Sequence, residues 1–125
     1  MRSRQLVALV VLGVVALAPV FLLARADDGK TIYGKKCVNC HGTSGKGDGP
    51  GAAQVEKAFK KKVGDFTAID LSKLAVPERA AKVEALKKVL AEAKAPMSAF
   101  WKVLTPADQA TVFEYVTKTY MKADK

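Results

Sequence analysis

The chain has 125 residues, half of them hydrophobic, and a formal net charge of +9. That length suits one small domain and is too short for several. The two cysteines are separated by only two residues, so a disulfide between them would close too short a loop to stabilise a fold well. A disulfide scaffold is therefore excluded, and a domain this small needs another group, such as a metal or a cofactor, to organise its core.

Residues 1–26 are predicted to be a secretory signal peptide. Two arginines precede an uncharged apolar run from Leu6 to Ala24, which ends in the small-residue cleavage signature ARA. The alternative is an uncleaved membrane anchor, because a helix over this run would span about 28 Å, close to the hydrocarbon thickness of a bilayer. Both interpretations predict export, with residues 27–125 as a domain outside the cytoplasmic membrane. Cleavage would leave a net charge of +6, since residues 1–26 contain three basic residues and no acidic one.

Four helical segments and no strand are predicted in residues 27–125. Apolar residues recur at helical spacing, whereas sustained alternation of apolar and polar residues is absent. Asp27 or Asp28 can cap the first helix, Pro77 is favoured as the first residue of the third, and Thr105 before Pro106 marks the start of the fourth. The expected helices are Asp28–Val38, Ala52–Val63, Pro77–Ala93 and Thr105–Lys122, with loops over Gly42–Gly51 and Gly64–Val76 and an irregular segment over 94–104. The fold class is therefore all-α.

The sequence CVNCH, from Cys37 to His41, contains both cysteines and the only histidine of the chain. C-x-x-C-H is the attachment signature of c-type haem. Cys37 and Cys40, one helical turn apart, can each add to a haem vinyl group, and His41 then lies beneath the iron as its proximal ligand. A thioredoxin-type motif would need a βαβ pattern and a structural zinc site would need a fourth ligand, so both are disfavoured. We therefore predict one covalently attached haem c per chain.

The second axial ligand has two methionine candidates outside the N-terminal segment, Met97 and Met121, besides any lysine. Because His41 is the only histidine, a bis-histidine haem within one chain is excluded. Met97 follows Pro96 in the irregular segment, where a side chain can point inward, whereas Met121 lies at the end of the last helix and is expected to pack or to face solvent. Met97 could instead be an ordinary core methionine. His/Met coordination is common in electron transfer, so Met97 is the predicted distal ligand.

These features resemble a class I cytochrome c, and the similarity extends from residue 29 to residue 120. In that family a glycine and an aromatic residue of the first helix meet an apolar and an aromatic residue of the last helix. The matching residues here are Gly29, Tyr33, Val112 and Tyr115. The family also has a proline whose carbonyl accepts a hydrogen bond from Nδ1 of the proximal histidine, and Pro50 matches it; such a bond fixes the ring. The resemblance implies the cytochrome c fold, with about four helices around one haem.

Other parts of the sequence have weaker assignments. The stretch from Ala52 to Ala95 is long for the smallest bacterial members of the family, and its helix Pro77–Ala93 matches no known function, so we expect it to pack over the haem. Trp101 is expected either to line the haem pocket or to pack in the core, because tryptophan is buried in both cases. A basic run could dock an acidic redox partner, although a solvated helix face is the commoner explanation. This run consists of Lys57, Lys60, Lys61 and Lys62.

The predicted function is single-electron transfer by a low-spin haem held by His41 and Met97, in a periplasmic or membrane-facing chain. Its partners would be redox proteins, acidic ones among them, that dock at the exposed haem edge; no nucleic-acid-binding motif is present. The alternatives are an electron-entry subunit of a larger oxidoreductase, and a haem sensor or peroxidase with an open sixth position. The last needs distal groups that handle protons, and residues 27–125 contain one arginine, Arg79, and no second histidine. An enzyme is therefore not expected.

Overall fold

The computed structural model describes residues 28–125, so the predicted signal peptide or anchor at 1–26 lies outside the described residues. The helices are α1 (Gly29–Lys36), α2 (Val38–His41), α3 (Ala52–Phe59), α4 (Val76–Ala91), α5 (Met97–Lys102) and α6 (Pro106–Thr119), with 3₁₀ turns η1 (Phe66–Ala68) and η2 (Leu71–Lys73) between α3 and α4. No strand occurs within 28–125, which confirms the predicted all-α class. In the same range no helix is long and apolar enough to cross a membrane.

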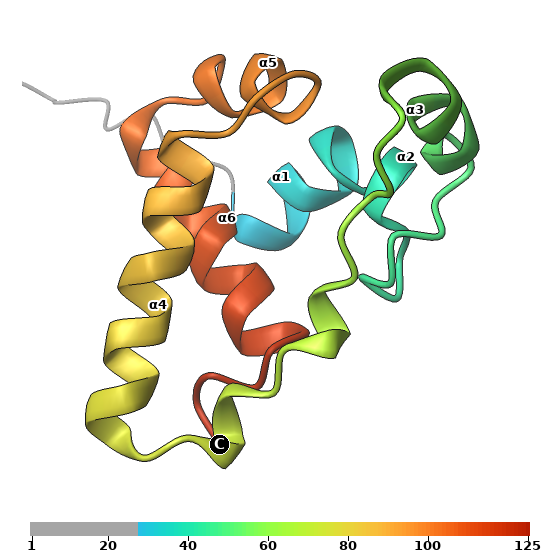
Figure 1. Cartoon of the computed structure of the whole chain (residues 1–125). Helices are drawn as coiled ribbons and strands as arrows, with labels where there is room; N and C mark the ends of the chain where they lie inside the picture. The colour runs from blue at the N-terminus through green and yellow to red at the C-terminus, as the bar shows by residue number, and fades with distance from the viewer. Residues whose placement is uncertain (1–27) are drawn as a thin grey trace, which may run out of the picture.

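The helices α1 and α6 cross near the centre of the molecule, and their contact forms the core (Figure 1). Tyr33 of α1 and Val112 of α6 are buried there. A Cβ atom at Gly29 would lie 2.5 Å from both the Thr111 carbonyl oxygen and Tyr115 Cβ, so only glycine lets the two backbones come this close. This contact confirms the helix crossing that the resemblance implied.

Side-chain caps determine where α1 and α6 begin. The Asp28 carboxylate accepts a hydrogen bond from the Thr31 N–H at 2.7 Å. The Thr105 hydroxyl accepts one from the Asp108 N–H at 3.1 Å. Each cap satisfies an N–H group that the first turn of a helix leaves without a partner. Thr105 is the cap that the sequence predicts, and Asp28 is one of its two candidates for the first helix.

All four predicted helices end later than the observed ones, α4 by two residues and α6 by three, and one helix is unexpected. The first predicted helix is interrupted at Cys37, which forms the junction between α1 and α2. The helix α3 stops at Phe59, before its predicted end, because Lys60 adopts a left-handed backbone conformation with a φ of 54°. The helix α5 occupies the segment that was predicted to be irregular. It begins at Met97, directly after Pro96, since proline is tolerated at a helix start but not in its interior.

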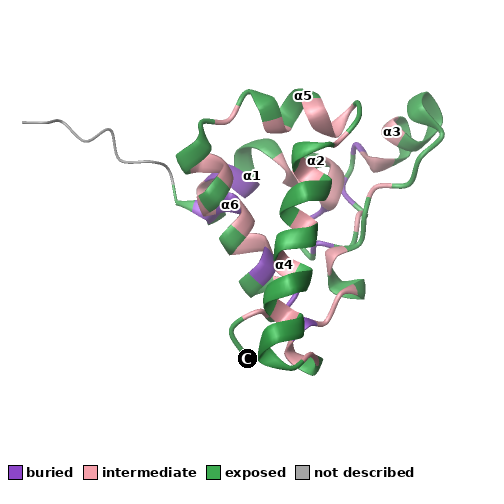
Figure 2. Ribbon diagram, turned by 60° about the vertical axis from the view of Figure 1, so that its left-hand side comes forward, coloured by how far each residue is buried: buried purple, intermediate pink, exposed green. Residues whose placement is uncertain are grey.

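The helix α4 runs along one side of the molecule and buries little of its own surface. Figure 2 shows buried residues in α1 and α6, whereas α4 is exposed along most of its length. Its apolar residues Val83, Leu86 and Leu90 are all half-buried. Leu86 and Leu90 face a cavity that is also lined by Tyr33 of α1. The apolar side of α4 therefore forms a wall of this cavity and does not pack into the core.

The segment between α3 and α4 is tied to the C-terminal end of the chain. Leu71 is fully buried, and its backbone N–H donates to the Met121 carbonyl oxygen at 2.8 Å. The Arg79 guanidinium donates to the Ala123 carbonyl oxygen at 3.0 Å. These bonds hold the segment beside the end of α6, and the segment in turn forms part of the wall of the same cavity.

Candidate functional site

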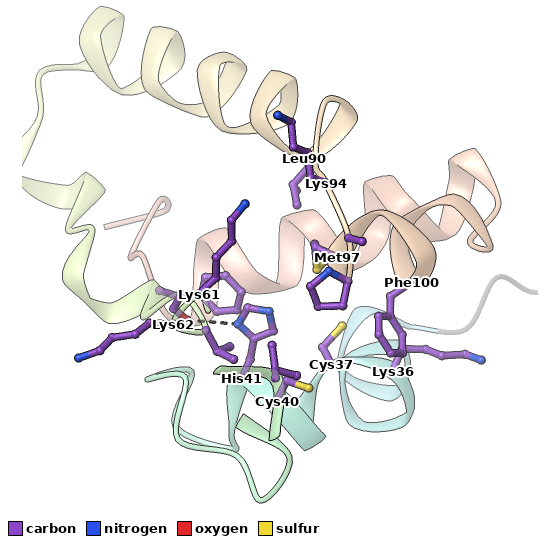
Figure 3. Close-up of a pocket in the computed structure, with 16 residues that line it drawn as sticks. Lys36, Cys37, Cys40, His41, Lys61, Lys62, Leu90, Lys94, Met97 and Phe100 are labelled. Atoms are coloured by element: carbon purple, nitrogen blue, oxygen red, sulfur yellow. Dashed lines mark hydrogen bonds between the residues drawn. The ribbon is translucent and has the colours of Figure 1, made fainter. Parts of the chain in front are cut away.

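A largely apolar cleft opens between the α1–α2 segment, α4 and α5 (Figure 3). It consists of two adjoining cavities of about 250 Å³ each. The outer cavity is bordered by Cys40 and Pro96, and the inner cavity by Tyr33 and Trp101. The residues common to both include Cys37, His41, Phe66, Met97 and Phe100. Together the cavities fall within the range of about 300–1,000 Å³ that small-molecule and cofactor sites occupy.

His41, the last residue of α2, is oriented by the segment that follows α3. Its Nδ1 lies 3.2 Å from the Gly64 carbonyl oxygen, and a carbonyl can only accept, so Nδ1 carries the proton. Nε2 therefore keeps a lone pair that can bind a metal ion. The ring is stacked on Phe66, with centroids 4.4 Å apart and planes inclined by 14°. Residues 64–66 thus set both the tautomer and the position of the imidazole.

The protonation state of His41 also suits a metal ligand. Burial lowers the pKa of His41 below its ordinary value, and the hydrogen bond to Gly64 acts in the opposite direction as the smaller effect. The imidazole is therefore neutral at neutral pH, which is the form that binds metals. Within residues 28–125 no three or more His, Cys, Asp or Glu side chains converge to hold a metal ion. A metal ion bound by His41 would therefore take its other ligands from outside this set of side chains.

The prediction that the Pro50 carbonyl accepts the hydrogen bond from His41 is wrong. The loop that contains Pro50 folds back on α2, and the Gly51 N–H donates to the Asn39 carbonyl oxygen at 2.7 Å. Pro50 is held beside Asn39, where it lines a separate surface pocket. The backbone acceptor for His41 comes instead from Gly64, further along the chain.

Cys37 and Cys40 lie on one helical turn, next to His41. The N–H groups of His41 and Cys40 lie 2.9 and 3.2 Å from the Cys37 carbonyl oxygen, which closes the turn. Both thiols are free and line the outer cavity (Figure 3). Burial raises the pKa of the Cys37 thiol to about 11, so this thiol is protonated at neutral pH. Two free thiols one turn apart beside an imidazole form the arrangement that thioether attachment of a cofactor requires.

Met97 lies on the side of the cleft that α5 forms, across from the α2 wall that carries His41 (Figure 3). As the first residue of α5, it lines both cavities. Trp101 of the same helix lines the inner cavity and also packs against the core. Met121, the other methionine candidate, is buried and lines the inner cavity but not the outer one. The structure therefore brings Met97 to the same cleft as the cysteines and the histidine.

Two tyrosines hold the chain immediately after His41. The Tyr33 hydroxyl donates to the Gly42 carbonyl oxygen at 2.7 Å, and the Tyr120 hydroxyl donates to the Thr43 carbonyl oxygen at 3.0 Å. Burial raises the pKa of Tyr33 well above its ordinary range, so its hydroxyl stays a donor. The α1–α6 crossing is thereby connected directly to the segment that carries the histidine.

Two contributors to this site were missed by sequence reasoning. The Gly64 carbonyl is a backbone acceptor, and a backbone acceptor leaves no signal in residue type or spacing. Phe66 is an aromatic residue in a loop of the sequence, and only the structure shows that it stacks on His41.

The residues of the cleft fit a flat, apolar cofactor with a central metal ion, such as haem. Apolar side chains from α4, α5 and α6 can cover a macrocycle, and the two thiols can attach its edge. The Nε2 atom of His41 supplies a nitrogen lone pair on one wall, and the thioether of Met97 supplies a sulfur on the other.

A protein-family model described as Cytochrome c matches residues 26–119. The match therefore includes every residue of the cleft described above except Met121. Comparisons with curated proteins and with solved structures found no match.

Proposed function

The chain belongs to the cytochrome c family, and on that premise we propose that it is a single-electron carrier whose haem iron is held between His41 and Met97. Family membership gives the cytochrome c fold, a covalently bound haem c with its iron, and haem-based electron transfer. The proposal adds the identity of the axial ligands, the low-spin state and the role of carrier.

Four side chains would hold the cofactor. Cys37 and Cys40 would form thioethers with its edge, while His41 Nε2 and the Met97 sulfur would bind the iron. The bound haem supplies one-electron chemistry between Fe(II) and Fe(III). Because both side chains would bind the iron in both oxidation states, little geometry would change on electron transfer and the reorganisation barrier would be small. The thioether ligand and the apolar walls both favour a raised reduction potential.

The observation that carries the proposal is the hydrogen bond from His41 Nδ1 to Gly64. It leaves Nε2 unprotonated at the wall of an apolar cleft, and Met97 lines the same cleft. A ligand whose ring is fixed in advance loses little freedom when it binds iron, and the hydrogen bond increases the basicity of the ring. Both properties suit an iron site that must keep its ligands during electron transfer.

A haem sensor or peroxidase has less support. Such a site needs distal groups that handle protons, and among the described residues that line the two cavities there is no arginine and no histidine besides His41. Arg79 instead donates to the backbone carbonyl oxygens of Ser72, Leu74 and Ala123. An electron-entry subunit of a larger oxidoreductase would use the same cleft and would differ only in its partner.

We also propose that the protein acts in the periplasm or at the periplasmic face of the inner membrane. Cytochrome c domains are typically exported, and residues 1–26 have the pattern of a signal peptide or an anchor. The intact mass of the exported protein distinguishes the two, because cleavage would give a chain that begins at Asp27. A haem-bearing chain found only in the cytoplasm would contradict the proposal.

The test of the axial ligands is the visible absorption spectrum of the oxidised and reduced holoprotein, produced with export and haem-maturation machinery. We expect a low-spin spectrum with a methionine–iron charge-transfer band in the native protein. The Met97→Ala variant should lose this band, because its side chain has no sulfur to bind the iron.

The matched control is Met121→Leu, a volume-conserving change at the other methionine of the domain, which should keep the band. A native protein that is high-spin and binds carbon monoxide would contradict His/Met ligation and indicate an open iron site. Loss of the band in Met121→Leu with retention in Met97→Ala would assign the sulfur ligand to Met121.

A further inference from the structure

The aromatic ring of Phe66 lies flat against one face of the His41 imidazole. The two ring centroids are 4.4 Å apart, and the planes are inclined by only 14°. Phe66 follows Gly64 and Asp65 in the chain, and the Gly64 carbonyl oxygen lies 3.2 Å from Nδ1 of the same imidazole (dashed line in Figure 3). One short segment therefore contacts the proposed iron ligand in two ways, at one atom of its ring and across one face.

Separate parts of the chain hold Phe66 in this place. Its backbone N–H donates to the Gly45 carbonyl oxygen at 2.8 Å, which ties η1 to the loop after His41. The ring of Phe66 is also stacked with that of Tyr120, at a centroid distance of 6.2 Å. Tyr120 is itself fixed by the hydrogen bond from its hydroxyl to the Thr43 carbonyl oxygen at 3.0 Å. The position of Phe66 therefore depends on contacts other than the one with His41.

The two contacts with His41 restrain different motions of the imidazole. A hydrogen bond at Nδ1 fixes one atom, and the ring can still tilt about that atom. A flat aromatic neighbour restrains the plane of the ring, because tilting would separate the two faces on one side and press atoms together on the other. Phe66 thus fixes the direction of Nε2 in a way that the hydrogen bond to Gly64 does not.

We propose that Phe66 is a positioning residue for the iron ligand: its ring sets the plane of the His41 imidazole and keeps Nδ1–H against the Gly64 carbonyl. The inference rests on the proposed electron-carrier function, in which Nε2 of His41 binds the haem iron. The plane of an axial imidazole decides how its orbitals overlap with those of the iron, and the hydrogen bond at Nδ1 increases its basicity. Phe66 therefore acts on the iron through His41.

The test compares Phe66→Leu with the native holoprotein by proton NMR. Leucine is also apolar but has no flat face, so the imidazole can turn. In the oxidised protein the hyperfine shifts of the haem methyl groups depend on the orientation of the axial ligands, and their order or spread should change. In the reduced protein the Nδ1 proton of His41 should exchange with solvent at least about tenfold faster, because the hydrogen bond to Gly64 opens more readily.

The reduction potential is the functional measurement. A weaker hydrogen bond at Nδ1 makes the imidazole less basic, and therefore less able to stabilise Fe(III). Because leucine and phenylalanine are both apolar, the polarity around the iron changes little, and the basicity of the ring decides the sign. The equilibrium constant for reduction should therefore increase about threefold in Phe66→Leu.

Two further variants separate positioning from general packing. Phe66→Tyr keeps the flat ring and should retain the native methyl shifts, exchange rate and potential. Phe113→Leu removes a half-buried ring that lines the inner cavity. Among residues 28–125 the aromatic residue stacked on His41 is Phe66, so Phe113→Leu should leave the order of the methyl shifts unchanged. Equal changes in Phe113→Leu and Phe66→Leu would overturn the proposal, as would a Phe66→Tyr variant that behaves like Phe66→Leu.

Tyr120 allows a test in which Phe66 stays in place. Tyr120→Leu removes the ring stacked with Phe66, whereas Tyr120→Phe keeps that ring and loses only the hydrogen bond to Thr43. The methyl shifts should change more in Tyr120→Leu than in Tyr120→Phe. Equal changes would count against the stacked rings as the cause, and this comparison decides the matter even where Phe66→Leu does not fold.

The methionine–iron band separates a failure of this inference from a failure of the proposed function. A native protein without the band would contradict His/Met ligation and overturn both. If the native protein and Phe66→Leu both show the band, unchanged methyl shifts and an unchanged potential in Phe66→Leu would overturn the positioning role alone. The ring of Phe66 would then only fill space beside the histidine.

Discussion

Gly29 determines how closely α1 and α6 approach each other. The Cβ of an alanine at this position would lie 2.5 Å from the Thr111 carbonyl oxygen, a backbone atom that cannot move unless α6 moves. We expect Gly29→Ala to lower the free energy of unfolding of the holoprotein by about 1–3 kcal/mol, the usual cost of an overpacked contact. Equilibrium urea unfolding followed by far-ultraviolet circular dichroism measures the change.

Gly34 in the same helix is the matched control for this prediction. A Cβ atom there would have no atom within 4 Å, because the position faces open space. Gly34→Ala should therefore stabilise the protein by about 0.4–1 kcal/mol, since alanine reduces the freedom of the unfolded chain. A similar loss of stability in both variants would mean that the helix crossing is not the cause.

Asp70 makes an acid-sensitive contact between η2 and the C-terminal end. Its carboxylate accepts hydrogen bonds from the Ser72 hydroxyl at 2.5 Å and from the Lys122 ammonium group at 3.0 Å, and these lower its pKa from 3.8 to about 2. A carboxylate with a lowered pKa stabilises the fold above its unfolded-state pKa, and this stabilisation is lost as the pH falls through its folded-state value. The stability advantage of the native protein over Asp70→Asn should therefore shrink between pH 3.8 and about pH 2. Urea midpoints of both proteins across this range test it.

Ser72→Ala provides an independent check on the same contact. The Ser72 hydrogen bond is the largest cause of the lowered pKa, so this variant should titrate Asp70 at a higher pH. The carboxyl carbon shift of Asp70, followed by NMR in the reduced protein, reports the titration directly. An unchanged titration in Ser72→Ala would contradict the assignment, as would a difference from Asp70→Asn that does not vary with pH.

At the scale of the helices, Gln109 connects α6 to α5. Its Nε2 donates to the Trp101 carbonyl oxygen at 2.8 Å, close to the end of a helix of only six residues that begins at Met97. We expect Gln109→Leu to weaken the orientation of α5, so that the methionine–iron band disappears at a lower urea concentration than in the native protein. Global unfolding should cost about 0.5–1.5 kcal/mol less, the net worth of one hydrogen bond.

The band and the far-ultraviolet circular dichroism are followed in the same urea titration. A Gln54→Leu variant, at an exposed position of α3, should change neither transition. If both signals shift together in Gln109→Leu, the residue contributes to general stability and does not position Met97.

Helix starts were predicted more accurately than helix ends, and the reason is physical. A cap such as Asp28 or Thr105 is a property of one residue and its immediate neighbours, so the sequence reveals it. The end of α3 depends on a left-handed conformation at Lys60, which lysine adopts rarely and which no pattern indicates. The helix α5 is shorter than the window in which hydrophobic periodicity can be recognised.

At the scale of the whole molecule, the candidate ligands could be predicted but their surroundings could not. The thiols and the imidazole lie within five consecutive residues, so their chemistry is local in the sequence. The hydrogen-bond acceptor for His41 is the backbone carbonyl of Gly64. Pro50 was predicted from its residue type, but tertiary contacts decide which carbonyl lies beside the ring. Likewise Lys36 and Lys94 line the same cavity as Lys61 and Lys62 only because three separate segments of the chain meet there.

The hydrogen bonds from Tyr33 and Tyr120 to the chain after His41 make the histidine side of the cleft more rigid than the methionine side. On the histidine side, the hydroxyl groups of Tyr33 and Tyr120 bind the chain after His41 to the buried core between α1 and α6. On the methionine side, α5 is short, and α4 beside it buries no residue completely. Gentle heating should therefore loosen the methionine side first, so that Met97 moves away from the proposed iron site while His41 stays in place.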